Sequence, residues 1–310
     1  MIASPEIQEA DILIAGDHDA DGKNHEIRAS NIEPFKGAEN IRILVAEDNL
    51  INQELIVALL EQLGGKADLA VNGWEALARS QTSTYDIILM DWQMPELDGC
   101  ETAIRIRQFE ASFLPPGAVS VYIIAMTANA IEGDREKCLA AGMDDFLAKP
   151  LGAAALRMGF DRWRSVRGAQ VPGSPAGVEN PSGADHALGS GEPGRVDWTR
   201  LTQMTRDDPD RWRKLLKLIL RQTPEYLSDL DAAVGMGSAP DVRRAAHKFY
   251  GSSAQAGLLT LADRLRVLEI LGDTGDLTQA SVVLSEVKDE FEIVRGKLES
   301  KLQSFARPSM

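Results

Sequence analysis

The sequence predicts two domains: an α/β domain with a doubly wound, five-stranded parallel sheet, followed by an all-α, antiparallel four-helix bundle. Three observations predict these fold classes. From about residue 41, short apolar stretches alternate with amphipathic helical patterns, as in parallel α/β sheets. Residues 168–195 are rich in Gly, Pro and Ser, a composition typical of a flexible linker. After this linker, apolar residues recur only at helical spacing.

The elements of the first domain, residues 41–167, follow one another in regular alternation. Five apolar stretches predict buried strands, and five amphipathic patterns predict the helices between them. The strands are expected at 41–48, 67–71, 85–91, 121–128 and 144–149, and the helices at 50–63, 73–82, 99–110, 130–141 and 151–166. Residues 1–40 are acidic and low in apolar content, so we expect a disordered N-terminal segment.

The second domain is expected over residues 196–303, with a short tail at 304–310. Three apolar stripes at helical spacing begin at Trp212, Leu258 and Leu277. A fourth helical pattern contains His247. Four amphipathic helices of this kind bury their apolar faces against one another as an antiparallel bundle.

Composition excludes several classes of function. The net charge of −14 argues against nucleic-acid binding, which normally needs a basic surface. No apolar run approaches the ~20 residues of a membrane span, and no basic region precedes an apolar stretch at the N-terminus, so we expect neither a membrane protein nor a secretory signal. The two cysteines, Cys100 and Cys138, predict neither a disulfide framework nor a zinc site. We expect a cytoplasmic protein.

Polar residues stand where the predicted strands end. Glu47 and Asp48 end the first strand, Asp91 the third, Thr127 the fourth and Lys149 the fifth. Ligands of parallel α/β sheets bind beyond these carboxyl ends. Clustered carboxylates repel one another unless a cation joins them, and an all-oxygen set with open positions suits Mg²⁺. Lys149 and Thr127 can bind the oxygens of a phosphoryl group on Asp91, which indicates phosphoryl transfer by positioning and charge neutralisation.

The helical pattern around His247 places this residue away from the apolar side. At about 100° per residue, Val242 and Phe249 share one side of the helix, and His247 lies nearly opposite. The pattern therefore argues against a buried core imidazole. Gly251 lies one turn further along and clears space, although glycine inside a helix costs roughly 1 kcal/mol. With Arg243 nearby, we expect His247 to face solvent and to receive an anionic group.

Residues 41–166 resemble the response-regulator receiver family. The stretches "ILVAEDNLINQ", "DIILMDWQMPELDG", "IIAMTANA" and "DDFLAKP" carry this resemblance. It implies that Asp91 is the phosphoacceptor and that Asp48 and Asp91 bind Mg²⁺ directly. It further implies that the carbonyl of Gln93 completes the protein ligands and that Glu47 acts through water.

The same resemblance assigns two residues to a conformational switch. It implies that Thr127 supplies the switch hydroxyl and that Phe146 is the coupled aromatic. The wording of "EDNLINQ" and "MTANA" is most similar to receivers attached to hybrid histidine kinases, which pass phosphate onward. A rival class, the haloacid-dehalogenase-like phosphatases, also combines Asp, Thr or Ser, and Lys. It needs a second Asp two residues after the first, where this chain has Gln93.

Residues 196–303 resemble a histidine phosphotransfer (HPt) domain. The stretches "AAHKFYGSSAQAG" and "LADRLRVLE" carry this resemblance, which implies that His247 is phosphorylated. Gly251 would let an acyl phosphate approach, and Lys248 would offset its charge. The family often places a lysine three residues after the histidine, where this chain has Tyr250.

Together the two resemblances imply a phosphorelay protein, a phosphoryl-group carrier without an ATP-binding kinase domain. Its expected partners are a histidine kinase donor and a downstream response-regulator receiver. The linker of about 28 residues has a mean span of roughly 30 Å, so transfer within one chain is feasible, and transfer between chains stays open. Two alternatives are the C-terminal part of a hybrid histidine kinase, and a phosphate sink or scaffold without onward transfer.

Overall fold

The computed structural model describes residue 35 and residues 37–127, 132–168 and 192–305. Residues 1–34, most of the predicted linker (169–191) and the end of the tail (306–310) lie outside the described residues, so the expected disorder and flexibility there stay predictions. The described residues all belong to one unit of mutually contacting structure.

The first domain is built on a five-stranded parallel sheet, as the sequence predicts. Its strands pair in the order β2-β1-β3-β4-β5, and every neighbouring pair is parallel. The strands are β1 (Arg42–Ala46), β2 (Lys66–Ala70), β3 (Ile87–Asp91), β4 (Tyr122–Thr127) and β5 (Asp145–Ala148). This order makes β1 and β3 adjacent, so the residues that follow them lie at one edge of the sheet.

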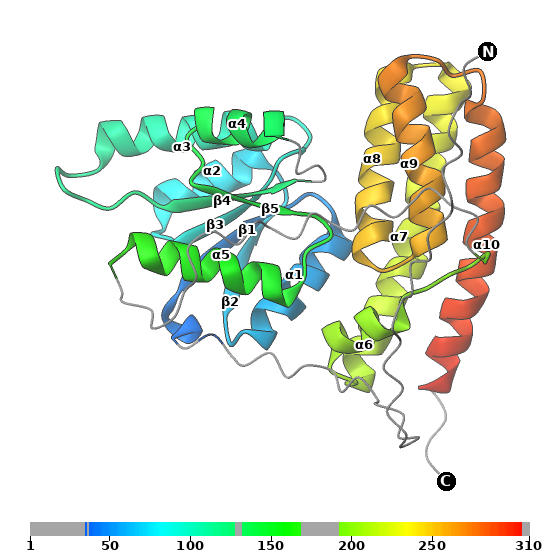
Figure 1. Ribbon diagram of the computed structural model, residues 1–310, viewed down its shortest axis with the longest axis horizontal. Coiled ribbons are helices and arrows are strands. Elements are labelled where there is room, and N and C mark those ends of the chain that lie inside the picture. Colours follow the sequence, from blue (N-terminus) through cyan, green and yellow to red (C-terminus); the bar gives the residue numbers. More distant parts are fainter. Residues whose placement is uncertain (1–34, 36, 128–131, 169–191, 306–310) are drawn as a thin grey trace, which may run out of the picture. The chain divides into compact units, whose positions relative to one another are not determined.

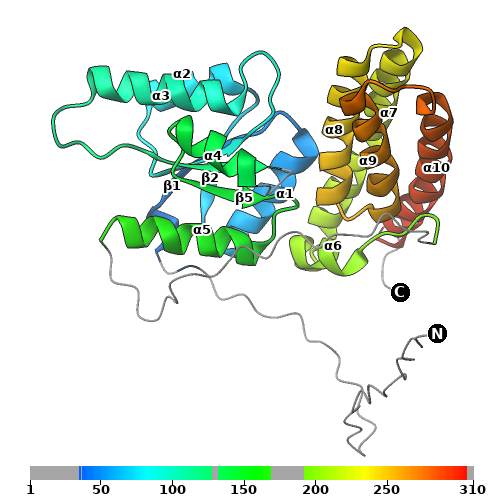
Figure 2. The same cartoon turned by 45° about the horizontal axis from the view of Figure 1, so that its top comes forward.

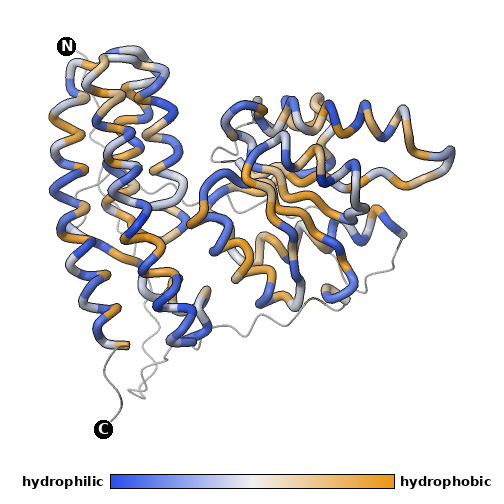
Figure 3. The backbone as a smooth tube through the Cα atoms, turned by 180° about the vertical axis from the view of Figure 1, so that it is seen from behind, coloured by the Kyte–Doolittle hydropathy of each residue, from blue (hydrophilic) through white to orange (hydrophobic). Residues whose placement is uncertain are grey.

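Helices cover both faces of the sheet (Figure 1). On one face lie α1 (Leu50–Gln62) and α5 (Ala153–Val166), and on the other lie α2 (Gly73–Thr82), α3 (Gly99–Phe113) and α4 (Glu132–Ala140). Side chains along a strand alternate between the faces. Accordingly, Ile43 and Val45 belong to one buried cluster, and Leu44 and Ala46 to another. The apolar strands between more polar helices are visible in Figure 3.

Ordered structure begins before residue 41, where we had placed the start of the first domain. Phe35 is 2% exposed, and its ring meets that of Phe160 edge-on at 5.5 Å between centroids. A 3-10 helix, Ala38–Asn40, then leads into β1. These few apolar residues follow a long acidic stretch, and no periodic pattern reveals them.

The second domain is a helical bundle (Figure 2). The helices α7 (Pro209–Met236), α8 (Ala239–Gln255), α9 (Leu259–Thr274) and α10 (Ala280–Ser304) form it, preceded by a short helix α6 (Trp198–Thr205) that the sequence pattern did not separate. Gly237 ends α7 with a left-handed φ of 66°, which lets the chain reverse within two residues into α8. Such short connections make consecutive helices antiparallel neighbours.

Trp212 occupies the core near one end of the bundle. Its side chain is fully buried, and its ring stacks on Phe305 at 5.6 Å and lies 6.3 Å from that of Trp198. This burial agrees with the place of Trp212 at the start of a predicted apolar stripe. Although α7 and α10 are long, no helix within the described ranges is long and apolar enough to cross a membrane.

Candidate functional site

Three carboxylates meet at the carboxyl edge of the sheet. Glu47 and Asp48 follow β1, and Asp91 is the last residue of β3. One oxygen from each of the three lies within 4.8 Å of the others. Glu47 and Asp91 are 1% and 6% exposed. The parallel pairing of β1 with β3 is the reason that these three residues meet.

Lys149 bridges two of these carboxylates. Its Nζ lies 2.7 Å from Oε2 of Glu47 and 2.9 Å from Oδ1 of Asp91. Burial and the neighbouring charge of Glu47 nevertheless raise the pKa of Asp91 well above its usual range, against the opposing effect of Lys149. Burial alone would lower the pKa of Lys149, but the charges of Asp91 and Glu47 raise it. The ammonium group of Lys149 alone thus does not offset the burial and mutual repulsion of Glu47 and Asp91.

The first turns of α1 hold Glu47 in place. Asn49 caps this helix, its Oδ1 accepting hydrogen bonds from the backbone N–H groups of Ile51 and Asn52 at 3.0 and 3.2 Å. Asn52 Nδ2 donates to Oε1 of Glu47 at 2.9 Å, and Gln53 Nε2 donates to the Glu47 carbonyl at 2.6 Å. Neither Asn49, Asn52 nor Gln53 is predicted as a site residue from the sequence, although all three lie in the stretch "EDNLINQ". Their spacing at the start of a helix was the available signal.

The remaining predicted residues of the first domain are Thr127, Gln93 and Phe146. Thr127, at the end of β4, is 6% exposed and lines the same cavity as Asp91. Gln93 lines that cavity too, and its backbone N–H lies 3.4 Å from Oδ1 of Asp91. Phe146 lies on β5 and packs against the buried cluster on the α2, α3 and α4 face.

His247 projects from the middle of α8 and is held by a carboxylate of α9. Its Nδ1 lies 2.7 Å from Oε1 of Glu269, and Arg266 Nη1 donates to the other oxygen of Glu269 at 2.7 Å. A carboxylate only accepts hydrogen bonds, so Nδ1 carries the proton and the neutral ring keeps its lone pair on Nε2. Glu269 is not predicted as a site residue from the sequence, although it is the last residue of the stretch "LADRLRVLE".

The environment keeps Glu269 ionised. Burial alone would raise the pKa of Glu269, but the hydrogen bonds from His247 and Arg266 and the charge of Arg266 lower it below its usual range. The side chain of His247 is 19% exposed, which is less open than the expected solvent-facing position. Glu269 of α9 contacts the ring at Nδ1, and residues of both domains line the cavity beside it.

A single cavity joins Asp91 to His247. It has a volume of about 170 Å³ and is lined by residues of both domains. From the first domain come Asp91, Trp92, Gln93, Thr127 and Lys137, and from the bundle come Arg243, His247, Arg266, Glu269, Ile270 and Asp273. Lys137, Arg243 and Arg266 thus bring cationic groups from α4, α8 and α9 to this cavity. Asp273 and Glu269 pair with Arg243 and Arg266, each at 2.7 Å.

Lys248 and Gly251 also face the first domain. Lys248 Nζ lies 2.8 Å from Oδ2 of Asp48, and Asn49 Nδ2 donates to the Lys248 carbonyl at 3.4 Å. Burial raises the pKa of Asp48 although the charge of Lys248 opposes this. A Cβ added at Gly251 would lie 4.0 Å from Nδ2 of Asn52, which is an ordinary contact. Gly251 thus faces α1, but the space there also admits an alanine.

Polar contacts extend along α1 and beyond β5. Lys214 and Arg211 of α7 pair with Glu54 and Glu61 of α1, each at 2.7 Å. Gln255 binds both backbone groups of Leu151: its Oε1 accepts from the N–H at 2.6 Å, and its Nε2 donates to the carbonyl at 3.0 Å. Leu151 follows Pro150, which is joined to Lys149 by a cis peptide bond.

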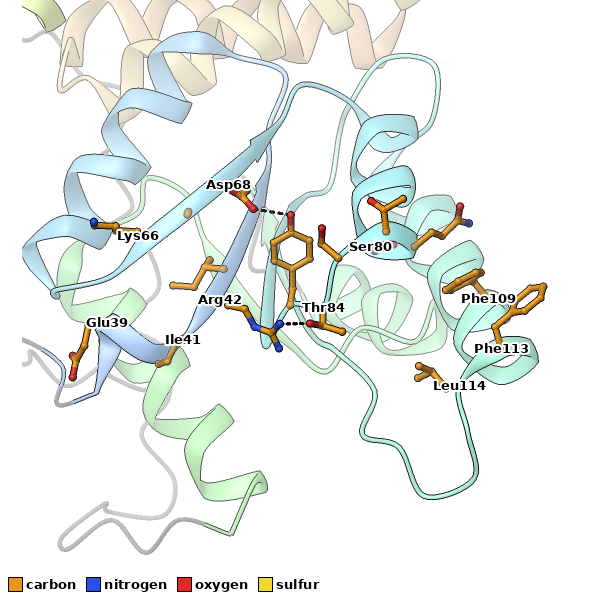
Figure 4. A pocket seen from close by; sticks show the side chains of 16 residues that line it. Glu39, Ile41, Arg42, Lys66, Asp68, Ser80, Thr84, Phe109, Phe113 and Leu114 are labelled. Carbon is orange, nitrogen blue, oxygen red and sulfur yellow. Dashed lines mark hydrogen bonds between the residues drawn. The ribbon is translucent and has the colours of Figure 1, made fainter.

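A larger cavity lies at the opposite end of the strands (Figure 4). It has a volume of about 940 Å³ and is lined by Ile41 and Arg42 at the start of β1 and by Lys66 at the start of β2. Within it, Tyr85 donates a hydrogen bond to Asp68 at 2.8 Å. None of the predicted site residues lines this cavity.

Two protein families match successive parts of the chain. Residues 43–159 match the response regulator receiver domain, and residues 214–297 match the Hpt domain. Hybrid signal transduction histidine kinase K of Dictyostelium discoideum is 39% identical over 125 residues, which cover 39% of this chain and 10% of that kinase. Signal transduction histidine-protein kinase BarA of Shigella flexneri is 28% identical over 231 residues, which cover 73% of this chain and 23% of that kinase. The chain spans less than a quarter of either relative.

Solved structures give local matches. One is the co-crystal structure of the Saccharomyces cerevisiae histidine phosphotransfer signaling protein Ypd1 with the receiver domain of its downstream response regulator Ssk1. The matched chain there is 33% identical, with 43% of this chain and 93% of that chain covered and a TM-score of 0.39. Another is the receiver domain of sensor histidine kinase PA1611 of Pseudomonas aeruginosa, with a magnesium ion in its active-site cleft. It is 42% identical, with 40% and 98% covered and a TM-score of 0.36.

Proposed function

Because the chain joins a receiver domain to an Hpt domain, we propose that it is a phosphorelay protein in which Asp91 passes a phosphoryl group to His247 of the same chain. The cavity that both residues line is the observation that carries this proposal. It provides a space of about 170 Å³ between the carboxylate and the imidazole, with cationic side chains around it. No further protein is needed to bring the two groups together.

In the first step, Asp91 accepts the phosphoryl group from a phosphohistidine of a histidine kinase. A carboxylate oxygen of Asp91 attacks phosphorus, a P–O bond forms, and the P–N bond to the donor imidazole breaks. Lys149, already 2.9 Å from Asp91, offsets the charge of the transferred group, and the Thr127 hydroxyl lies in the same cavity to bind one of its oxygens. The receiver resemblance further implies that Thr127 on β4 and Phe146 on the neighbouring strand β5 act together as the switch pair.

The carboxylates of Glu47, Asp48 and Asp91 fit a bound Mg²⁺. Their oxygens lie within 4.8 Å of one another, and burial, followed by the charge of Glu47, raises the pKa of both Asp48 and Asp91, an effect that a divalent cation would oppose. Asn52 presents a buried Oδ1 that accepts no hydrogen bond from the described residues, and an ion-bound water can satisfy it. Asp48, Asp91 and the Gln93 carbonyl would hold the ion, with Glu47 acting through water. When bound, Mg²⁺ neutralises charge on the phosphoryl oxygens.

In the second step, Nε2 of His247 attacks the phosphorus of phosphorylated Asp91. A P–N bond forms, the P–O bond to Asp91 breaks, and its carboxylate is restored. The phosphorylated ring keeps its proton on Nδ1 and becomes cationic, and Glu269 offsets this charge through the 2.7 Å contact. Arg266 and Arg243 line the path of the phosphoryl group and offset its negative charge.

Onward transfer requires the two domains to separate. A second receiver would have to reach His247, and in the structure the chain's own receiver covers this face of α8 through Lys248 and Gly251. Separation is therefore part of the proposed cycle, with a downstream response-regulator receiver as the next acceptor. The similarity to parts of much longer histidine kinases favours a second candidate, in which the chain is the C-terminal part of a hybrid histidine kinase. Both candidates use Asp91 and His247 in the same way.

Phosphorylation by acetyl phosphate with Mg²⁺ tests the proposal. We expect base-labile label on Asp91 followed by acid-labile label on His247. Asp91→Ala should abolish both, and His247→Ala should leave only the base-labile label. Label that stays on Asp91 of the wild-type chain would favour a phosphate sink instead.

A further inference from the structure

Lys248 places an ammonium group on the acidic cluster of the receiver. Its Nζ lies 2.8 Å from Oδ2 of Asp48, one of the three carboxylates whose oxygens cluster within 4.8 Å. Lys248 follows His247 directly in α8, and the helix carries both residues to the receiver together. Whenever His247 faces Asp91 as in this structure, the ammonium group of Lys248 therefore forms an ion pair with Asp48.

The charges of the cluster show what this contact means for a metal ion. The carboxylates of Glu47, Asp48 and Asp91 carry three negative charges, and Lys149 supplies one positive charge. A divalent cation balances the remaining two by itself. The ammonium group of Lys248 then adds a positive charge in excess of this balance. It repels the bound cation and competes with it for the carboxylate of Asp48.

A phosphoryl group on Asp91 changes this balance. The carboxylate of Asp91 carries one negative charge, and a phosphoryl group on it carries close to two at neutral pH. The cluster then accommodates both a divalent cation and the ammonium of Lys248. Bound cation thus disfavours docking of the bundle on the receiver while Asp91 is unphosphorylated. Phosphorylation of Asp91 makes docking favourable again.

Building on the proposed function, we propose that Lys248 is a built-in competitor of Mg²⁺ at Asp48. In the unphosphorylated chain, Mg²⁺ and the docked bundle oppose each other, so the ion loosens the contact and leaves Asp91 open to a donor. By linkage, the docked bundle weakens Mg²⁺ binding by the same factor. Lys248 is therefore a positioning residue that couples docking of the bundle to the state of Asp91.

Calorimetric titration of the full chain with Mg²⁺ tests this inference without measuring phosphotransfer. We expect Lys248→Ala to bind Mg²⁺ about 3- to 10-fold more tightly than wild type, since the pair is partly exposed and its effect is modest. Lys248→Arg keeps the charge and should bind like wild type. Lys288→Ala removes an equal charge from the distant Lys288–Asp231 pair and controls for net charge.

Equal Mg²⁺ affinities of wild type and Lys248→Ala would overturn the inference, as would weaker binding by Lys248→Ala. Equal tightening by Lys248→Ala and Lys288→Ala would overturn it too, because net charge would then explain the effect. The proposed function fails differently: Mg²⁺ would bind none of these chains, or would bind Asp48→Asn and Asp91→Asn as well as wild type.

Discussion

Asp91, at the carboxyl end of β3, and His247, in the middle of α8, line one cavity of about 170 Å³. Each side chain is already held by its own domain: Asp91 by Lys149 at 2.9 Å and His247 by Glu269 at 2.7 Å. The groups that the proposed reaction joins are thus oriented before any phosphoryl group arrives. Orientation of this kind converts a bimolecular step into an intramolecular one.

The hydrogen bond between Glu269 and His247 predicts a pH-dependent stability. The folded-state pKa of Glu269 lies below its ordinary value of 4.5, so the folded protein favours the ionised carboxylate. This stabilisation is present above pH 4.5 and is lost as the pH falls through the lower folded-state value. Glu269→Gln should reduce the free energy of unfolding by about 1–3 kcal/mol at pH 7, measured by urea denaturation, with a smaller deficit below pH 4.

Glu286→Gln provides the control for Glu269. Glu286 pairs with Arg264 at 2.6 Å, and both side chains are about half exposed. Such a pair contributes about 0–1 kcal/mol. A deficit for Glu269→Gln that is no larger than this, or that does not change with pH, would contradict the role of its charge.

Close packing of α8 on α9 predicts that Gly272→Ala is destabilising. A Cβ at Gly272 would lie 2.5 Å from the backbone nitrogen of Arg243, so the two helices would have to move apart. We expect a loss of about 1–3 kcal/mol in the free energy of unfolding. Gly296, in the helix α10, is the matched control because an added Cβ meets nothing within 4 Å. Gly296→Ala should stabilise the protein by up to about 1 kcal/mol, and equal effects of the two variants would refute this packing argument.

The ion pair between Lys214 and Glu54 predicts a charge-reversal phenotype. Lys214→Glu places two carboxylates where the structure has a 2.7 Å pair, so it should slow transfer from Asp91 to His247 about 3- to 10-fold. Adding Glu54→Lys restores opposite charges and should recover most of the rate. A double variant as slow as the single variant would show that this pair does not form during transfer. Single-turnover transfer after labelling of Asp91 is the measurement.

The space at Gly251 predicts a size-dependent effect on transfer. An added Cβ there makes only an ordinary 4.0 Å contact with Asn52, so Gly251→Ala should transfer within about twofold of wild type. A leucine extends further toward α1 and should slow transfer at least about tenfold, while helix propensity favours both substitutions over glycine. If alanine were as damaging as leucine, the domains would approach more closely during transfer than in this structure.

The fold could be predicted from the sequence largely because its periodicities are strong. Apolar strands such as Ile87–Asp91 and the apolar stripes of α7 and α10 are buried as expected. The carboxylates also follow from the fold class, because residues at the carboxyl ends of adjacent parallel strands must meet. Phe35 and α6 were missed because a single aromatic residue and a two-turn helix carry little periodic signal.

Contacts between the two domains could not be predicted in the same way. Helix geometry placed His247 and Gly251 on a polar face, but it does not reveal what covers that face. Glu269 lies in a different helix, and only the packing of α8 on α9 brings it to His247. Similarly, nothing in the local sequence around Lys248 indicates that it meets Asp48. Pairs of this kind depend on how elements pack.

Mixing two complementary variants tests the central claim, transfer within one chain, most directly. His247→Ala can label only Asp91, and Asp91→Ala can accept label only at His247. An equimolar mixture treated with acetyl phosphate and Mg²⁺ is compared with the wild-type chain at the same concentration. We expect His247 to be labelled in wild type at a rate independent of protein concentration, and at least about 100-fold more slowly in a micromolar mixture, given the millimolar effective concentration of a linked domain. Equal rates in the mixture and in wild type would contradict transfer within one chain.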